Sequence, residues 1–430
     1  MPHFEVSSIS IIFADICVVL LLSRVLGVAM RALGQPTVIA EIVAGIVLGP
    51  SVVGVLWPQL SGALFPEAAV AGLRQLSQLG LVLFMFLVGL ELDATAFKGR
   101  ASAVVFISHA SIAVPFALGA ASALWLWPRY SEPHVPLGVF VMFLGVAMSV
   151  TAFPVLARIL SEQNLSASRV GRIAMACAAI DDVTAWCLLA LVVALARAQG
   201  AAHALWTAAL ALLFVLFTWQ LMRRALRRLG RAIQRRDQLT PAVLAVILML
   251  VIACSLATEL IGIHALFGAF AFGAAMPKQS EVVKGLSEKL ETVTVLLLLP
   301  LFFAYSGLRT QIGLLARPED WLVTLAIVVI ATAGKAGGGT LAARISGIPW
   351  REAGTIGVLM NTRGLMELVV LNAGMDLGII SPSVFTMLVI MALVTTCATT
   401  PVVRRLNPEV ASSPVVAGEA RDIPVGVQSP

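Results

Sequence analysis

Charged residues are scarce in this chain. Only 12% of its 430 residues are Asp, Glu, Lys or Arg, whereas 59% are hydrophobic, and the mean hydropathy is +0.97. One soluble core could not bury that much apolar surface, so the composition excludes an ordinary soluble globular protein. The formal net charge of +6 is spread between the apolar runs and forms no single basic face, which argues against nucleic acid as a partner. We therefore expect a protein surrounded by membrane lipid.

Cysteine is also rare, and motifs typical of enzymes are missing. The five cysteines lie inside apolar stretches, without the spacing of a metal site or a disulfide framework. The sequence has no Gly-rich phosphate loop after a strand, no His/Cys metal pattern and no nucleophile elbow. We predict that the protein is not an enzyme and needs no cofactor.

Long apolar runs divide the chain into about thirteen candidate transmembrane helices. They lie near residues 8–28, 37–56, 72–92, 102–126, 136–160, 168–196, 203–222, 241–262, 264–277, 292–308, 321–345, 350–374 and 383–403. The run at 264–277 is short for a full crossing. With it included, most Lys and Arg residues fall on one side, among them Arg31 and Arg158, which favours an inner-membrane (plasma-membrane) protein with its N-terminus outside and its C-terminus in the cytoplasm.

The two halves of the chain resemble each other weakly. The paired segments are LFMFLVGLELD with LFFAYSGLRTQ (Leu83–Asp93 and Leu301–Gln311), and AEIVAGIVLGP with FGAFAFGAAMP (Ala40–Pro50 and Phe267–Pro277). Each partner lies an odd number of spans later, so the second copy would cross the membrane upside down. Either similarity alone could be chance in Gly-rich apolar sequence, but both in the same order favour two inverted repeats.

The repeats give a division of the chain. We expect a transmembrane domain over 1–403, with repeat one at about 8–196, a linking helix at about 203–222 and repeat two at about 241–403. Residues 404–430 read as a short disordered cytoplasmic tail, from which no cytoplasmic domain could be built.

Ionisable residues inside the spans are few, and such residues are functional candidates because they are costly in a bilayer. The strongest candidates are Asp181 and Asp182 in AAIDDVTAW. Adjacent carboxylates cannot both ionise cheaply in low dielectric, and consecutive helix positions lie about 100° apart, so one can pair with a cation while the other faces a cavity. A carboxylate that faces water there binds either a proton or a small cation, which is the minimal machinery of antiport. A purely structural pair would need permanent partners for both.

Lys335, in ATAGKAGGGTLAA, is the natural counter-ion. A lone ammonium group in the middle of a membrane must pair or deprotonate, unless its long side chain reaches an interface. Asp15 and Glu41 are weaker candidates, since neither has an evident partner and either could be an interfacial or packing carboxylate. His109 is more often a satisfied hydrogen-bonding group than a ligand.

The fifth span is interrupted at SVTAFP (Ser149 to Pro154). Pro154 removes a backbone donor there, and the hydroxyls of Ser149 and Thr151 can satisfy the freed carbonyls. Paired interruptions in corresponding spans of two repeats point to an ion site.

The matching interruption is NTRG in the twelfth span, beginning at Asn361. Arg363 and Glu367 are four residues apart on one helix face, so we expect them to neutralise each other or the half-helix dipoles.

These residues lie in segments that resemble the second family of monovalent cation:proton antiporters, which includes NapA-type sodium/proton exchangers, Kef-type potassium systems and the plant cation/proton exchangers. The resemblance covers about residues 30 to 403. It rests on QPTVIAEIVAGIVLGPS (Gln35 to Ser51), FLVGLELD (Phe86 to Asp93), SVTAFPVLARIL (Ser149 to Leu160), AAIDDVTAW (Ala178 to Trp186) and GVLMNTRGLMELVVLNAG (Gly357 to Gly374).

The resemblance implies an all-α polytopic fold of the NhaA/NapA type, in which a core domain of crossed, discontinuous helices slides against a dimerisation domain within a homodimer. It implies that Asp182 carries the transported cation and the proton, that Asp181 pairs with Lys335, and that Thr151 neighbours the ion. The Asp-Asp pair with a membrane lysine is the pattern of electrogenic members, which supports two protons per cation. The segment MNTRGLMELVVLN is most similar to the plant exchangers, which are associated with potassium, so the choice between Na⁺ and K⁺ stays open. Many Kef-type members have a C-terminal nucleotide-binding domain, which we do not expect here.

We therefore predict a secondary antiporter that exchanges Na⁺ or K⁺ for protons. One alternative is a gated K⁺ efflux pore, which would dissipate a cation gradient without moving protons. Another is a solute transporter on the same fold, although an organic anion site would be expected to present net positive charge.

Overall fold

The structure, a computed structural model, describes residues 8–91, 101–166, 168–197, 201–218, 220, 240–276 and 281–407. This part of the chain is helical throughout and contains no β-strand. Its helices are α1 (Ser8–Ala32), α2 (Thr37–Leu48), α3 (Val53–Leu56), α4 (Pro58–Leu64), α5 (Glu67–Glu91), α6 (Ala101–Tyr130), α7 (Leu137–Ser149), α8 (Phe153–Glu162), α9 (Arg169–Arg197), α10 (Ala201–Phe217), α12 (Pro241–Ile261), α13 (Ala265–Ala275), α14 (Glu281–Val293), α15 (Leu299–Leu308), α16 (Pro318–Thr332), α17 (Gly338–Ile345), α18 (Trp350–Met360), α19 (Leu365–Asp376) and α20 (Pro382–Leu406). Three short turns, η3 (Thr294–Leu298), η4 (Ile312–Leu314) and η5 (Ala333–Gly337), complete the described elements.

Eleven of these helices or joined helices are long and apolar enough to cross a bilayer. The other two expected spans coincide with α10, which has 17 residues, and α13, which has 11. Eleven residues of α-helix rise about 16 Å, roughly half of the hydrocarbon thickness. The expected number of thirteen full spans is therefore not confirmed. The expected tail lies outside the described residues from position 408 onwards.

Apolar runs become helices here because a bilayer offers no hydrogen-bond partner to an open backbone. The helix ends follow local sequence signals. The hydroxyl of Ser381 accepts a hydrogen bond from the Val384 amide at 3.4 Å at the start of α20, and Gly262 ends α12 with a φ of +98°, which favours glycine.

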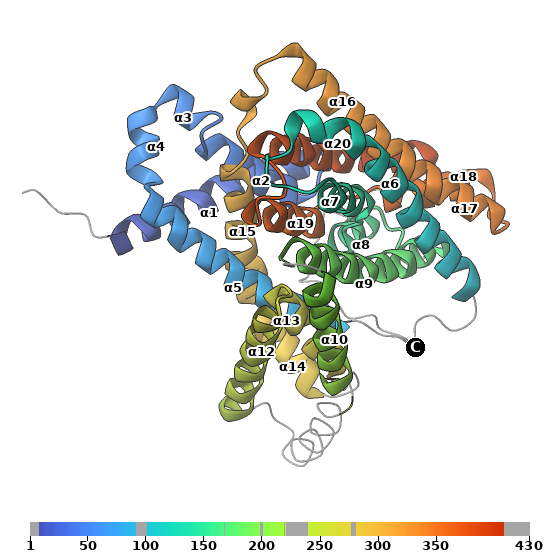
Figure 1. The fold of residues 1–430 in the computed structure, drawn as a ribbon, viewed down its shortest axis with the longest axis horizontal. Helices are drawn as coiled ribbons and strands as arrows, with labels where there is room; N and C mark the ends of the chain where they lie inside the picture. The colour runs from blue at the N-terminus through green and yellow to red at the C-terminus, as the bar shows by residue number, and fades with distance from the viewer. Residues whose placement is uncertain are drawn as a thin grey trace, which may run out of the picture.

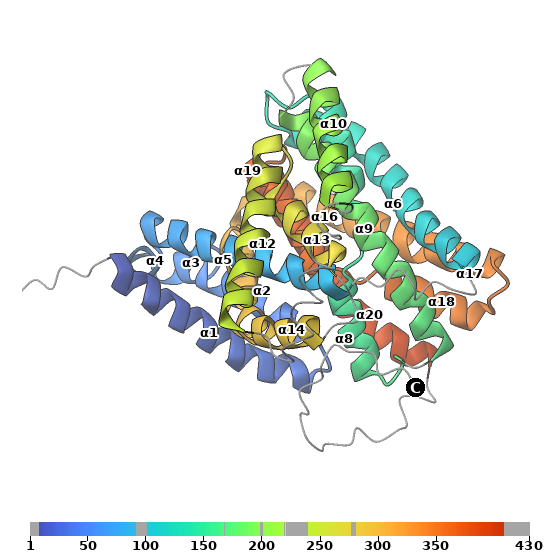
Figure 2. The same cartoon turned by 90° about the horizontal axis from the view of Figure 1, so that it is seen from below.

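The helices pack as two bundles (Figures 1 and 2). The site bundle contains α6 to α9, α16 to α20 and η5, whereas the flanking bundle contains α1, α2, α5, α12, α13 and α15. In the site bundle α9 packs against α6, α7 and α18. The two bundles contact each other less extensively, for example where α15 meets α19, and α10 touches both α9 and α12.

The segments that resemble each other lie together in the flanking bundle. Helix α2 packs against α15, and α5 packs against α13, so each first-half segment contacts the partner of the other one. Glycine permits both close contacts, because a Cβ on Gly45 would overlap the carbonyl oxygen of Ala304, and one on Gly273 would overlap that of Phe86. This exchange of partners is what a two-fold inverted repeat produces. The ends of two segments, at positions 92–93 and 277, lie outside the described residues.

The two interrupted helices cross at their breaks. The fifth expected span is divided into α7 and α8, and the twelfth into α18 and α19. The Ala152 amide in the first break donates to the carbonyl oxygen of Thr362 in the second at 2.9 Å. The fold is thus an all-α membrane architecture with crossed, discontinuous helices in the middle of the site bundle.

Candidate functional site

Both acidic residues of α9 are buried at the centre of the site bundle. Asp181 is 1% exposed and Asp182 is 4% exposed. Because consecutive helix positions are about 100° apart, the two carboxylates leave α9 in different directions. They consequently meet different neighbours.

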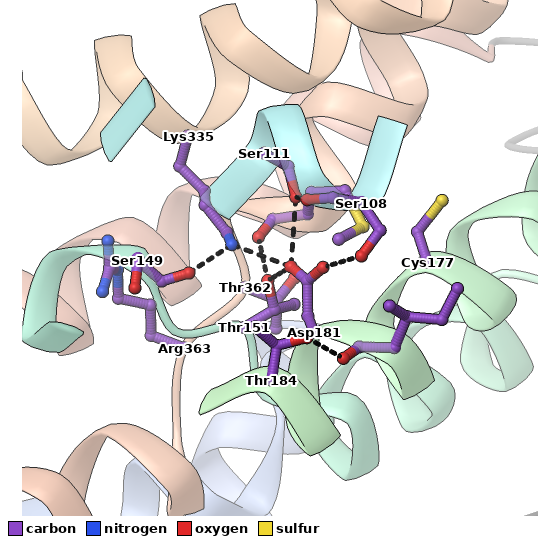
Figure 3. Close-up of polar contacts among 12 residues, drawn as sticks. Ser108, Ser111, Ser149, Thr151, Cys177, Asp181, Thr184, Lys335, Thr362 and Arg363 are labelled. Atoms are coloured by element: carbon purple, nitrogen blue, oxygen red, sulfur yellow. Dashed lines mark hydrogen bonds and ion pairs between the residues drawn. The ribbon is translucent and has the colours of Figure 1, made fainter. Parts of the chain in front are cut away.

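The Asp181 carboxylate is surrounded by donors from three other segments (Figure 3). Its Oδ2 atom is 2.9 Å from the Lys335 ammonium and accepts a hydrogen bond from the Thr151 hydroxyl at 2.8 Å. The hydroxyls of Ser108 and Ser111 donate to Oδ1 and Oδ2 at 2.5 and 3.1 Å. With four donors and no contact with solvent, this carboxylate has its hydrogen-bonding needs met inside the protein.

The two serines were not among the expected site residues. They lie three positions apart on α6 and therefore share one helix face. A serine in a membrane helix often bonds only to its own backbone, and Ser111 also donates to the Ser108 carbonyl at 2.9 Å. The pattern SHAS with two hydroxyls on one face was the available signal.

Lys335 projects from η5, a π-helical turn between α16 and α17, and its side chain is fully buried. Its ammonium group contacts the Asp181 carboxylate and donates to the carbonyl oxygen of Ser149 at the end of α7. Such π-turns change the direction of side chains within a helix and frequently occur at functional sites. The lysine thus pairs inside the protein and does not extend to an interface.

The environment of Asp182 is different. Its Oδ1 atom is buried and has no hydrogen-bond partner among the described residues. The backbone amide of Phe153, the first residue of α8, faces this carboxylate. Asp182 therefore lies at the amino end of a half-helix, where the helix dipole favours negative charge, and it keeps one oxygen free for another ligand.

Arg363 closes the carboxyl end of α7. Its guanidinium donates to the carbonyl oxygens of Ala147 and Met148 at 2.8 and 2.6 Å and to the Glu367 carboxylate at 2.6 Å. Lys335 meets the next carbonyl, that of Ser149. Two buried cations thus face the negative end of the α7 dipole, which offsets the carbonyls left free by the break.

The remaining residues of the breaks have distinct positions. The Thr151 hydroxyl also contacts the Met360 carbonyl at 3.1 Å, at the end of α18. The Ser149 hydroxyl bonds within its own helix, to Val146 at 2.9 Å. Pro154 lies in the first turn of α8, where a missing N–H needs no partner, so it starts the second half-helix and does not free a carbonyl within the first.

Asn361 follows α18 directly and is 4% exposed. Its side-chain oxygen, like that of Asp182, is buried without a partner in the described part of the chain. A buried amide oxygen without a donor is unusual and calls for an explanation, such as a bound ion or water.

The weaker candidates lie elsewhere. Asp15 is fully buried in α1, and neither of its oxygens has a partner within the described ranges. Glu41 lines a cavity between α1, α2 and α15. His109 bonds to the Val105 carbonyl of its own helix at 2.8 Å. None of the three contacts Asp181 through a hydrogen bond or ion pair in the described part of the structure.

An unexpected cluster of polar contacts joins the two bundles at Asp376. Asp376, the last residue of α19, pairs with Arg309 at 2.8 Å and with Arg74 of α5 at 3.0 Å. Arg309 also donates to Asn372 of α19 at 2.9 Å. Nothing local in the sequence connects Arg74 or Arg309 with Asp376.

The chain has clear relatives among known proteins. Residues 17–405 match the family model for the transmembrane region of sodium/hydrogen exchangers. A Na⁺/H⁺ antiporter of Synechocystis, NhaS4, is 40% identical over 405 residues, which are 94% of this chain and 99% of that protein. The K⁺/H⁺ antiporter 1 of Saccharomyces cerevisiae and the cation/H⁺ antiporter 17 of Arabidopsis thaliana are 35% and 38% identical over 95% and 92% of this chain.

These relatives differ in length. The chain spans about half of the yeast and plant proteins, 48% in both cases. A solved structure of the antiporter MjNhaP1 from Methanocaldococcus jannaschii shares the fold, with a TM-score of 0.65 over 94% of this chain and 99% of that one, at 12% identity. The crossed breaks and the buried Asp-Asp-Lys cluster thus lie in a multi-pass membrane protein that belongs to the sodium/hydrogen exchanger family of cation/proton antiporters.

Proposed function

We propose that the protein exchanges cytoplasmic Na⁺ or K⁺ for external protons, and that the cation and the proton compete for Asp182. The observation that carries this proposal is the contrast between two adjacent carboxylates. Asp181 has four donors, whereas the buried Oδ1 of Asp182 has none in the described part of the chain. A free, buried carboxylate oxygen is the group that a small hard cation or a proton would occupy.

The ligands of the cation would come from the two breaks. Asp182 supplies the charge, and the unpartnered oxygen of Asn361 is the second candidate ligand. Thr151 helps to hold the breaks together through its contacts with Asp181 and Met360. In this proposal Asp181, Lys335, Arg363 and Glu367 keep the site in shape and balance its charge.

Alternating access would follow from the two bundles. The site bundle would slide against the flanking bundle and carry Asp182 from one side of the membrane to the other, an elevator-type motion. The close Gly-mediated packing of α2 on α15 and α5 on α13 makes the flanking bundle a firm support for such movement. We further propose a homodimer in the inner membrane with the N-terminus outside and the C-terminus in the cytoplasm.

The proposal also covers the number of protons exchanged per cation and the identity of the cation. Lys335 can exchange its partner or its proton during the cycle, which would give two protons per cation and an electrogenic reaction. The named relatives include a Na⁺/H⁺ antiporter and a K⁺/H⁺ antiporter, so both ions are substrates to be compared.

The experiment that tests this function uses proteoliposomes loaded with a pH-sensitive dye. Addition of Na⁺, K⁺, Li⁺ or Rb⁺ at several pH values should release protons with the wild-type chain and not with Asp182→Asn. Asp15→Asn is the matched control, because Asp15 is another buried, unpartnered carboxylate among the described residues but lies in the flanking bundle. Unchanged exchange by Asp182→Asn would reject the assignment, and cation flux without proton movement would favour the pore.

A further inference from the structure

A cavity opens between the two bundles, away from the Asp181–Asp182 cluster. Its volume is about 270 Å³, and it is lined by residues of α1, α2, α8, η3 and α15. Three arginines line it: Arg24 and Arg31 from α1, and Arg158 from α8. Arg31 and Arg158 are among the cations that the sequence assigns to the cytoplasmic side.

The charge of this cavity favours an anion. Glu41 is the one acidic residue in the lining, so the four ionisable side chains leave an excess of positive charge. Arg158 is already occupied by Glu162 at 2.9 Å and by the Thr37 hydroxyl at 2.7 Å. Arg24 and Arg31, by contrast, make no ion pair with any described residue. Two guanidinium groups in the second half of α1 therefore have donors to spare, and guanidinium binds phosphate well.

A neutral hydrogen-bond donor also belongs to the lining of this cavity. Ser23 lies one position before Arg24 and is 5% exposed, and its hydroxyl has no hydrogen-bond partner among the described residues. A buried hydroxyl without a partner is unusual, and a ligand in the cavity would satisfy it. Ser23, Gly27 and Arg31 are four residues apart and thus lie on one face of α1.

The rest of the lining is apolar and faces outward. Val295 and Leu296 of η3 line the cavity and are 39% and 48% exposed, as is expected of side chains that contact lipid tails. A cationic site directly beside an apolar, exposed surface matches the two parts of a phospholipid, the phosphate and the acyl chain. A soluble phosphate ion would make no favourable contact with the apolar side of the cavity.

We propose that this cavity binds the phosphate of an anionic phospholipid, with Arg24, Arg31 and Ser23 as its ligands. The lipid would lie against both bundles, since Arg158 of the site bundle lines the cavity together with residues of the flanking bundle. Its presence would therefore stabilise the arrangement of the bundles seen in this structure and change the rate of transport.

Binding is tested on the full chain by thermal unfolding in detergent, with and without added dioleoyl phosphatidylglycerol. The lipid should raise the melting temperature of the wild-type protein, whereas dioleoyl phosphatidylcholine should raise it less. The double variant Arg24→Gln/Arg31→Gln should lose at least half of the difference between the two lipids, and Ser23→Ala should lose a smaller share. Arg405→Gln is the matched control, because Arg405 is an exposed arginine at the end of α20 that does not line the cavity.

Three outcomes would overturn the proposal. The first is an unchanged lipid effect in the double variant, and the second is an equal loss in Arg405→Gln. The third is a full stabilising effect of inorganic phosphate alone, which would assign the cavity to a soluble anion. Because unfolding is measured without transport, this result is independent of whether Asp182 carries the cation.

In proteoliposomes, replacement of dioleoyl phosphatidylcholine by dioleoyl phosphatidylglycerol should change the initial rate of exchange severalfold for the wild type. The change should be smaller for the double variant. The single variant Arg31→Gln provides a second test should the double variant fold poorly. A rate that responds equally to the lipid in all variants would contradict the proposed coupling to the bundles.

Discussion

Two adjacent aspartates on different faces of α9 lie in opposite environments. On one face, Asp181 meets a lysine, a threonine and two serines; on the other, Asp182 meets the first amide of α8 and keeps one oxygen without a partner in the described structure. A buried charge pair with full hydrogen bonding is difficult to disturb, because removal of either member leaves the other uncompensated. A buried carboxylate with a free oxygen is open to a ligand. We therefore expect substitution of Asp181 to reduce mainly stability, and substitution of Asp182 to reduce mainly transport.

The largest effect should come from Asp181→Asn or Lys335→Met. Each substitution leaves one buried charge of the pair without its partner, which costs about 3 to 5 kcal/mol of folding free energy. Thermal unfolding in detergent should show a clear drop in melting temperature for both single variants, and substantial recovery in the double variant Asp181→Asn/Lys335→Met.

The contrasting variant is Asp182→Asn, which should abolish transport yet keep the melting temperature at or above that of the wild type, because it replaces a carboxylate whose Oδ1 lacks a partner with a neutral group of the same shape. A drop as large as that of Asp181→Asn would remove the distinction between the two faces.

The second effect concerns the break beside Asp181. Arg363→Lys keeps the charge but cannot reach two carbonyls and the Glu367 carboxylate at once, since an ammonium group lacks the planar fork of guanidinium. We expect a loss of about 1 to 3 kcal/mol from carbonyls left unpaired. The measurement is again thermal unfolding. Arg344→Lys is a matched control, because Arg344 lies at the end of α17, where its guanidinium lies over the ring of Trp350. An equal loss of stability in Arg344→Lys would show that the break does not specifically require arginine.

Some residues of the site could be predicted from the sequence, whereas most of their contacts could not. Asp181, Asp182 and Lys335 could be singled out because ionisable residues inside apolar runs are rare, and the breaks because Pro154 and the polar NTRG segment interrupt such runs. Periodicity also showed that the two carboxylates diverge. It did not show which neighbour each one meets, since the contact of Lys335 with Asp181 joins residues 154 positions apart.

Long-range packing explains what was missed. Ser108 lies 73 positions from Asp181, and Arg74 lies 302 positions from Asp376. Neither contact has a local pattern, because a serine or an arginine is compatible with many surroundings. Hydropathy, which is a local property, did locate α13: the run expected at 264–277, short for a full crossing, forms a helix over Ala265–Ala275.

A smaller effect should follow from Thr151→Val. The threonine hydroxyl contacts both the Asp181 carboxylate and the Met360 carbonyl, so its loss weakens the tie between the site and the crossed breaks. We expect about 1 to 2 kcal/mol of destabilisation, within the range of hydrogen bonds between membrane helices. Thr151→Ser retains the hydroxyl and should behave almost like the wild type in thermal unfolding. Equal losses in both variants would mean that the methyl group, not the hydroxyl, matters.

The smallest effect on stability is expected for a substitution outside α9, at the boundary between the two bundles. Asp376 pairs with Arg74 and Arg309, but these side chains are 22%, 48% and 16% exposed, so Asp376→Asn should cost no more than about 1 kcal/mol. Since the pair links α19 to the flanking bundle, its loss should nevertheless increase amide hydrogen exchange in the second half of α19. The control is Glu352→Gln, whose pairing with Arg169 at 3.7 Å joins two helices of the same bundle. Equal exchange in α19 for both variants would show that the Asp376 contact does not restrain one bundle against the other.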